Sequence, residues 1–246
     1  MKRRAPQGFT LIELSIVLVI IGLLIGGIVA GKTLIRTAEL RKNVLLLQEL
    51  NSAVLAFKLK YNVLPGDMTN ATQLWGVKDD CQALHIRSTD GTTCNGDGNG
   101  IIATQSSEFP ENHCVWQHLS NARLVTGIYS CSYGSGTSLE DYYSALDVPQ
   151  AIGRGGYLNL YFGDPPFYGT HAYTFWAVNS DWDIDAPVFT PGEAHYLDSK
   201  MDDGKPNTGQ SRILPSNECA TGYGPEDIYQ ATVVDIVCNL SVKAIF

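Results

Sequence analysis

Hydrophobic residues follow two different patterns in the first sixty positions of the chain. Residues 11–30, LIELSIVLVIIGLLIGGIVA, form an apolar run of about the length that crosses a bilayer as a helix. Beyond it, apolar residues recur at steps of three or four, on one helical face: Leu40, Val44, Leu47, Leu50, Val54, Phe57 and Tyr61. The pattern stops at Leu64-Pro65-Gly66-Asp67, a strong helix breaker. We therefore predict one helix from Phe9 to Tyr61, about 80 Å long. Its first half is apolar enough to cross a membrane, and its second half is amphipathic.

After Pro65 the chain changes to short apolar runs separated by Gly, Asn, Asp, Ser and Pro. Three runs rich in aromatic or β-branched residues are predicted strands: Tyr157–Phe162, Ala172–Val178 and Ala231–Val237. Residues Glu111–Leu124 are predicted to form a short helix. With the long helix, these elements indicate an α+β fold in which an antiparallel sheet packs on the helix. The expected organisation is a leader at residues 1–8, the helix at 9–61 and a globular domain at 62–246.

Composition and charge narrow the classes of function. The chain has 246 residues, a formal net charge of −8 and 44% hydrophobic residues, which is enough to build a core. An acidic surface repels phosphates, so nucleic acid is not an expected partner. The sequence contains no GxSxG or P-loop pattern and no histidine beside an evident nucleophile. We therefore expect that the protein is not an enzyme.

Six cysteines form three sequential pairs with partners 13 to 19 residues apart: Cys81 and Cys94, Cys114 and Cys131, Cys219 and Cys238. None has the short CxxC spacing of a zinc or redox site. An even count at this spacing suits disulfide bonds in an oxidising compartment, which would place most of the chain outside the cytoplasm. Six cysteines permit about 15 pairings, of which the sequential set is the simplest. Buried free thiols are the alternative.

Three interpretations of the apolar run compete. A cleaved secretory signal has an apolar core of about 7–15 residues followed by a small-residue site. Here the run is longer, and Ile28-Val29-Ala30 is a weak site. A plain membrane anchor fits the length but leaves Glu13 unexplained, because a carboxylate inside a spanning helix costs roughly 2.5–3.5 kcal/mol on insertion scales. The third interpretation rests on the residues that precede the run.

Those residues account for Glu13. Lys2-Arg3-Arg4 is a basic leader that ends at Gly8 and is followed by Phe9-Thr10-Leu11-Ile12-Glu13. This stretch resembles the cleavage and methylation motif of type IV pilins and type II secretion pseudopilins. The resemblance implies that a prepilin peptidase cuts between Gly8 and Phe9 and methylates the new amino group. It also implies that Glu13 pairs with the terminal amine of a neighbouring subunit during assembly, which would offset the desolvation of the carboxylate.

The same resemblance sets the expected partners and location. The partners are other pilin or pseudopilin subunits, the prepilin peptidase, an inner-membrane assembly platform and membrane lipid. The chain would cross the bacterial inner membrane once, with its C-terminal domain in the periplasm, before it joins a periplasmic or extracellular filament. A type IV minor pilin for adhesion or DNA uptake, or a membrane-anchored periplasmic binding protein, remains an alternative. Three segments also resemble large pilin-like proteins of Gram-negative bacteria and favour a pseudopilin or minor pilin: Lys60–Asp67, Trp116–Leu119 and Asp202–Gly209.

Calcium is the one candidate cofactor. Residues Asn95–Gly100 look like the first half of a calcium loop, but Ser106 stands where the bidentate glutamate is expected, so we interpret them as a turn beside Cys94. The second oxygen-rich patch contains Asp198, Asp202, Asp203 and Asn207. Major pseudopilins bind calcium in a C-terminal loop, and the resemblance therefore makes this patch the better candidate for a calcium site.

Overall fold

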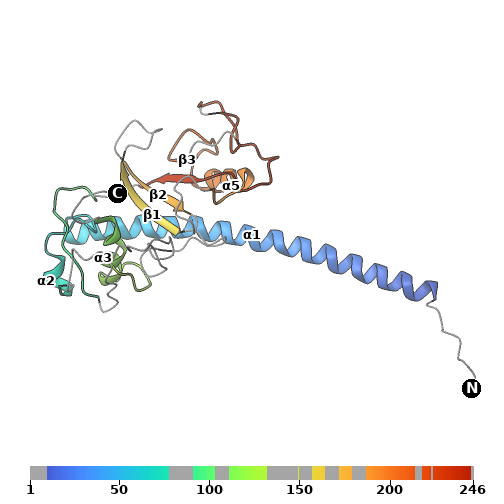
Figure 1. Cartoon of the computed structure of the whole chain (residues 1–246), viewed down its shortest axis with the longest axis horizontal. Helices are drawn as coiled ribbons and strands as arrows, with labels where there is room; N and C mark the ends of the chain where they lie inside the picture. The colour runs from blue at the N-terminus through green and yellow to red at the C-terminus, as the bar shows by residue number, and fades with distance from the viewer. Residues whose placement is uncertain are drawn as a thin grey trace, which may run out of the picture. The chain divides into compact units, whose positions relative to one another are not determined.

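The structure is a computed structural model of the whole chain, in which a long N-terminal helix is followed by short helices and a small sheet (Figure 1). It describes residues 10–77, 91–102, 111–131, 149, 157–163, 172–178, 187–213, 218–222 and 224–244. The chain divides into two compact units, Met1–Glu39 and Leu40–Phe246. The described core lies in the second unit.

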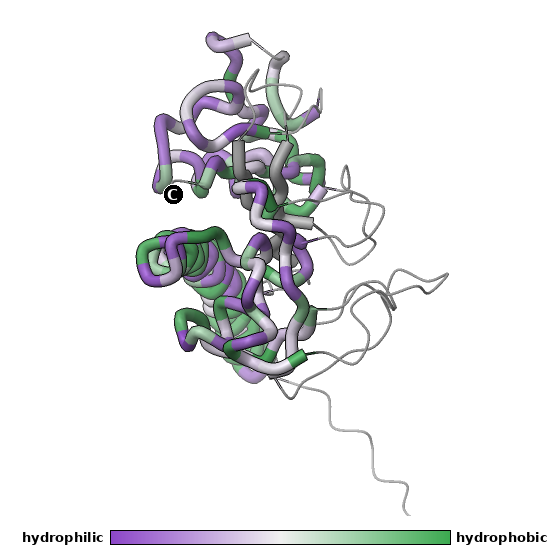
Figure 2. The backbone as a smooth tube through the Cα atoms, turned by 90° about the vertical axis from the view of Figure 1, so that its left-hand side faces the viewer, coloured by the Kyte–Doolittle hydropathy of each residue, from purple (hydrophilic) through white to green (hydrophobic). Residues whose placement is uncertain are grey.

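Helix α1 (Leu11–Tyr61) is a continuous helix of 51 residues, as predicted, although the predicted first residue, Phe9, lies outside the described residues. In the first unit its large apolar side chains are exposed, from Leu11, which is 89% exposed, to Ile35 at 63%. Green, hydrophobic turns of this helix are visible in Figure 2. Among the described residues, α1 is the helix that is long and apolar enough to cross a membrane.

In the second unit, α1 buries one face. The predicted stripe is confirmed, with Tyr61 only partly buried at its end; the buried apolar members are Leu40, Val44, Leu47, Leu50, Val54 and Phe57. The helix ends because Asn62 turns into the left-handed region at φ 56°, a conformation that asparagine tolerates. Pro65 then prevents the helix from continuing. The amphipathic half of α1 is therefore part of the globular core.

Within the residues that the structure describes, the sheet has four antiparallel strands in the order β1-β2-β4-β3. Their bounds are Tyr157–Gly163 for β1, Ala172–Val178 for β2, Ser211–Ile213 for β3 and Leu240–Lys243 for β4. The strands predicted at 157–162 and 172–178 are confirmed, and they pair with Leu160 opposite Phe175. Strand β4 lies between β2 and β3, with Ser241 opposite both Trp176 and Arg212. The antiparallel sheet and long helix confirm an α+β, pilin-like fold.

The strand predicted at Ala231–Val237 is wrong. That segment is irregular, and its Val234 side chain is 81% exposed. The next residue, Cys238, is bonded to Cys219, and its backbone pairs with Phe189 outside the sheet. These two constraints hold the chain away from the sheet until Leu240, so β4 begins only there. The β-branched residues before Cys238 therefore do not form a strand, because these contacts and not β-propensity decide where the chain joins the sheet.

The described part of the second unit also contains short helices: α2 (Ala71–Trp75), the 3-10 helix η1 (Glu111–His113), α3 (Val115–Asn121) and α5 (Pro191–Met201). The helix predicted at 111–124 is present as η1 and α3, with a break at Cys114. Helix α5 was not predicted, although its start carries a readable signal. Thr190 and Glu193 form a reciprocal capping box around Pro191.

Candidate functional site

The start of α1 is closed by a capping box that the sequence analysis missed. One carboxylate oxygen of Glu13 accepts hydrogen bonds from the Thr10 backbone N–H at 2.8 Å and from the Thr10 hydroxyl at 2.7 Å. The Glu13 N–H donates back to the Thr10 hydroxyl oxygen at 3.3 Å. The T-x-x-E spacing is the sequence signal for this arrangement. Gly8 and Phe9, the predicted processing residues, lie outside the described residues.

Two of the predicted cysteine pairs are disulfide bonds. Cys114 is bonded to Cys131 and Cys219 to Cys238, with Cα–Cα distances of 4.2 and 5.1 Å. Cys94 is also disulfide-bonded, but its predicted partner, Cys81, lies outside the described residues. No described cysteine is free. Cysteines in this state agree with folding in an oxidising compartment.

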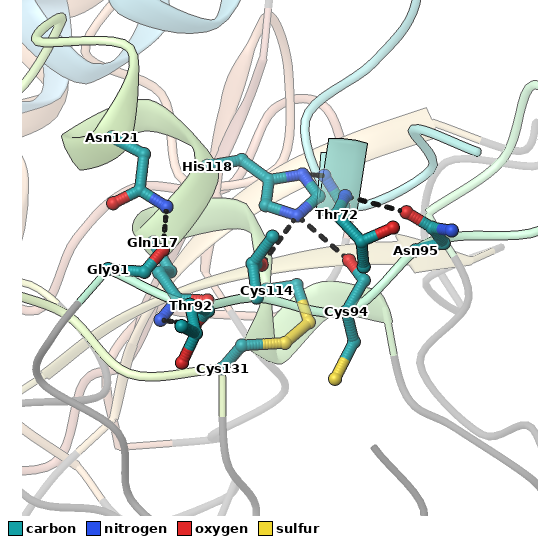
Figure 3. Close-up of a disulfide and its surroundings, with 12 residues drawn as sticks. Thr72, Gly91, Thr92, Cys94, Asn95, Cys114, Gln117, His118, Asn121 and Cys131 are labelled. Carbon is teal, nitrogen blue, oxygen red and sulfur yellow. Dashed lines mark hydrogen bonds between the residues drawn. A yellow bond between two sulfur atoms is a disulfide. The ribbon is translucent and has the colours of Figure 1, made fainter. Parts of the chain in front are cut away.

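His118, on α3, joins three segments at the end of α1. Its Nδ1 accepts a hydrogen bond from the Gly66 N–H at 2.9 Å, which places the ring proton on Nε2. Nε2 lies 3.0 Å from Thr93 Oγ1 and 3.2 Å from the Cys94 carbonyl oxygen. Figure 3 shows this ring above the Cys114–Cys131 bond, with a dashed line to the carbonyl oxygen of Cys94.

The His118 ring is fully buried and stacks on Phe57 of α1 at a centroid distance of 6.3 Å. Trp75 of α2 lies 5.5 Å from it, also between ring centroids. Burial lowers the pKa of His118 to about 4, and the hydrogen bond to the Cys94 carbonyl oxygen acts in the opposite direction. The imidazole is therefore neutral at pH 7, and its role here is to hold the fold together.

The predicted calcium patch is brought together in part. Asp198, Asp202 and Asp203 each offer an oxygen within 4.8 Å of the others. Asp198 is fully buried, its Oδ2 accepts the Tyr229 hydroxyl at 2.9 Å, and its Oδ1 has no hydrogen-bond partner. Burial, with a smaller contribution from the two neighbouring carboxylates, raises the pKa of Asp198 to about 7.

The other members of this patch are partly committed to backbone. Asp202 Oδ2 accepts the N–H groups of Gln210 and Ser211, the latter at 3.0 Å. Asp203 accepts the Thr208 hydroxyl and the Lys205 N–H. The amide nitrogen of Asn207, the fourth predicted ligand, donates to the carbonyl oxygens of Gly222 and Gly224 at 3.0 and 3.1 Å. The three aspartates thus form the cluster, whereas Asn207 instead binds the backbone of the loop that contains Gly222 and Gly224.

A second carboxylate cluster contains Asp67, Asp97 and Glu111, whose oxygens also lie within 4.8 Å of one another. Asp67 and Glu111 are buried, and Asp97 is exposed. Burial raises the pKa of Asp67, and the Asp97 carboxylate adds to that effect. The sequence analysis missed this cluster as a set, because 30 residues separate Asp67 from Asp97 and 14 separate Asp97 from Glu111.

The part of the chain that the structure describes also has a groove of about 160 Å³ beside the amphipathic half of α1. Leu47, Met201 and Val242 contribute to its wall, and Lys243 is the charged residue in its lining. Pockets for small ligands usually measure about 300–1,000 Å³ and combine apolar walls with several polar groups. This groove therefore gives little support to a ligand-binding function.

Comparison with known proteins addresses the first 30 residues. Residues 3–29 match the family described as "Prokaryotic N-terminal methylation motif". This motif is the signature of type IV pilins and pseudopilins, so the chain carries the signature of that class. It implies processing by a prepilin peptidase and assembly with other pilin subunits, and the exposed apolar helix supports membrane anchoring. Neither the curated proteins nor the solved structures gave a significant match to the chain.

Proposed function

We propose that this protein is a structural subunit of a type II secretion pseudopilus or a related type IV pilus filament. The observation that carries the proposal is the methylation motif at residues 3–29, which overlaps the first part of a 51-residue helix. The first part of that helix exposes its apolar side chains, and the second part belongs to a globular core. A subunit that is first stored in a membrane and then packed into a filament through its N-terminal helix needs a helix with an apolar first part and a second part that belongs to the globular core.

In the proposed pathway the precursor crosses the inner membrane once and holds its C-terminal domain in the periplasm. A prepilin peptidase cuts between Gly8 and Phe9 and methylates the new amino group. Cleavage before the apolar run leaves the helix in the membrane. Glu13 then pairs with the terminal amine of a neighbouring subunit. No catalytic step is assigned to the chain itself.

Mass spectrometry of the protein purified from its own membranes tests this proposal. The expected product is a mature chain that begins at Phe9 and carries one added methyl group. A strain without the prepilin peptidase is the control and should yield the uncut chain. Recovery of a chain that retains Met1 or Lys2 from cells with active peptidase would reduce the leader to part of a simple anchor. The proposed function would then fail.

The same filament class contains the alternative of a minor pilin for adhesion or DNA uptake. The three segments that resemble large pilin-like proteins favour a pseudopilin or minor pilin over an adhesive major pilin. Deletion of the gene separates the possibilities. Loss of protein secretion with normal adhesion and DNA uptake supports the pseudopilus, and the reverse pattern supports the minor pilin.

We also propose that the cluster of Asp198, Asp202 and Asp203 binds calcium. The buried Asp198 Oδ1 without a hydrogen-bond partner supports this proposal, because a cation would satisfy it. The ion would tie the end of α5 to the segment that leads into β3. Chelation is expected to lower the melting temperature of the protein, and Asp202→Asn should reduce that sensitivity. Superimposable melting curves in calcium and in chelator would refute the site.

A further inference from the structure

Three carboxylates from separate parts of the chain meet beside the end of α1. Asp67 follows the turn that ends this helix, Asp97 lies in the loop at 95–100, and Glu111 begins η1. One oxygen from each lies within 4.8 Å of the others. Two oxygens that share one calcium ion at about 2.3–2.6 Å cannot be more than about 5 Å apart, so this spacing fits a common ion.

Asp67 provides the second observation. Its side chain is 1% exposed, and its Oδ2 accepts the Gly100 N–H at 2.9 Å. Its Oδ1 is buried without a hydrogen-bond partner. A buried acceptor of this kind destabilises the fold when it is left unsatisfied, and more so when it is charged. Burial raises the pKa of Asp67, the backbone of Gly100 and Gly98 opposes this effect, and the neighbouring Asp97 carboxylate adds to it.

The loop that carries Asp97 is held firmly against Asp67. The Gly96 N–H donates to the Met68 carbonyl oxygen at 2.9 Å, and a Cβ on Gly96 would overlap the backbone of Gly66 and Asp67. The Asp97 N–H donates to Glu111 Oε1 at 2.8 Å, which fixes the loop to η1. Cys94, which is disulfide-bonded, directly precedes this loop; Figure 3 labels Cys94 and Asn95, the first residue of the loop. The carboxylates are therefore positioned before any ion arrives.

We propose that Asp67, Asp97 and Glu111 form a calcium site that joins the end of α1, the loop at 95–100 and η1. Three carboxylates supply hard oxygen ligands and a charge that exceeds that of the ion, and water or carbonyl oxygens complete the usual six to eight. The loop resembles the first half of a calcium loop that lacks its final glutamate. Here Asp67 and Glu111, which are distant in sequence, take the place of that ligand.

Hydrogen–deuterium exchange of the full-length chain in detergent tests the site directly. Calcium added to chelator-treated protein at about 1 mM, the range of extracellular calcium modules, should slow exchange in peptides that cover 95–102 and 111–117. Asp97→Asn removes an exposed ligand with little risk to folding and should weaken the calcium dependence of this protection by about tenfold or more. Asp202→Asn, in the other aspartate cluster, is the matched control and should leave this local protection unchanged.

Asp67→Asn gives a second test, in which the variant should be more stable than wild type without calcium but should no longer respond to calcium. Its amide removes a buried like charge and offers a donor to Asp97, so the variant should melt higher than wild type in chelator. It should also lose the calcium-dependent protection at 95–102. The proposal is overturned if calcium protects only the segment around Asp202, if it protects nothing, or if Asp97→Asn responds to calcium as wild type does. None of these outcomes bears on cleavage after Gly8, so this site and the proposed function can fail separately.

Discussion

Acid is expected to destabilise the globular unit through His118. The folded chain holds this imidazole at a pKa of about 4 because it is buried, whereas an exposed imidazole in the unfolded chain titrates near 6.5. The unfolded state therefore takes up a proton first as the pH falls. The contribution of His118 to stability is fully present above about pH 6.5, decreases between about pH 6.5 and 4, and levels off below that range, whereas Asp198, with its pKa raised to about 7, contributes with the opposite sign as the pH falls.

The size of the effect follows from the same two values. At about 1.4 kcal/mol per pH unit, the full loss is about 3 kcal/mol, of which about 2 kcal/mol is reached by pH 5. Native proteins usually have a free energy of unfolding of about 5–15 kcal/mol, so this loss is a large share of the total. Protonation would place a hydrogen on Nδ1, which now accepts the Gly66 N–H. The neighbours in contact with the ring, including Phe57, Trp75 and Thr93, carry no charge that could stabilise the cation.

Denaturant unfolding, followed by tryptophan fluorescence of the full chain in detergent with chelator present, measures this dependence. His118→Asn is the comparison, because its carbonyl oxygen can accept the Gly66 N–H without titrating. This variant should be less stable than wild type at about pH 7 through lost ring contacts, but because only wild type carries the His118 contribution, the difference between the two should shrink by about 3 kcal/mol as the pH falls from about 7 to 4. Equal pH slopes in wild type and variant would show that other groups cause the acid sensitivity, and the argument from His118 would be wrong.

Two further predictions concern backbone geometry and assembly. Gly66→Ala should lower the free energy of unfolding by about 2–3 kcal/mol or more, since Gly66 has φ 91° and a Cβ would lie 2.6 Å from the Glu111 carbonyl oxygen. Gly100→Ala is the control, because Gly100 has φ 86° and an added Cβ would have nothing within 4 Å, so this variant should lose only the free energy that comes from the unfavourable backbone conformation. Denaturant unfolding midpoints compare the two variants. Glu13→Ala and Glu13→Gln should both be cleaved normally but give few filaments, as sheared-fraction blots can show. Normal filament yield in Glu13→Gln, which keeps the capping box, would mean that the cap and not the charge is required.

The helix and its motif were predictable because their signals are local. The step of three or four between Leu40 and Phe57 directly specifies the buried face, and Pro65 specifies the end. The Gly8–Glu13 stretch is likewise contiguous. The strand β2 was found because aromatic and β-branched residues make up most of it. In each case the information lies within one segment and does not depend on what the segment contacts.

The errors and omissions depended on contacts between distant residues. The β-branched run before Cys238 resembles a strand, but a disulfide and a bridge to Phe189 decide where the chain joins the sheet. Strand β3 is three residues long, too short for any periodicity to reveal. The Asp97 loop was interpreted as a simple turn because Asp67 and Glu111 are adjacent to it only in the folded chain. Sequence spacing carries no information about such tertiary neighbours.

The segment at residues 64–68, which follows α1, does more than end that helix. Leu64 and Met68 enter the core, Gly66 donates to His118, and Asp67 belongs to a carboxylate cluster. These contacts hold the end of α1 in the globular unit, whereas Glu13 belongs to the other unit and lies far from that end along the chain. Sites so far apart that share no partner should have additive effects on stability. Substitutions at Gly66 should therefore impair folding before processing matters, and substitutions at Glu13 should leave the fold intact and affect assembly alone.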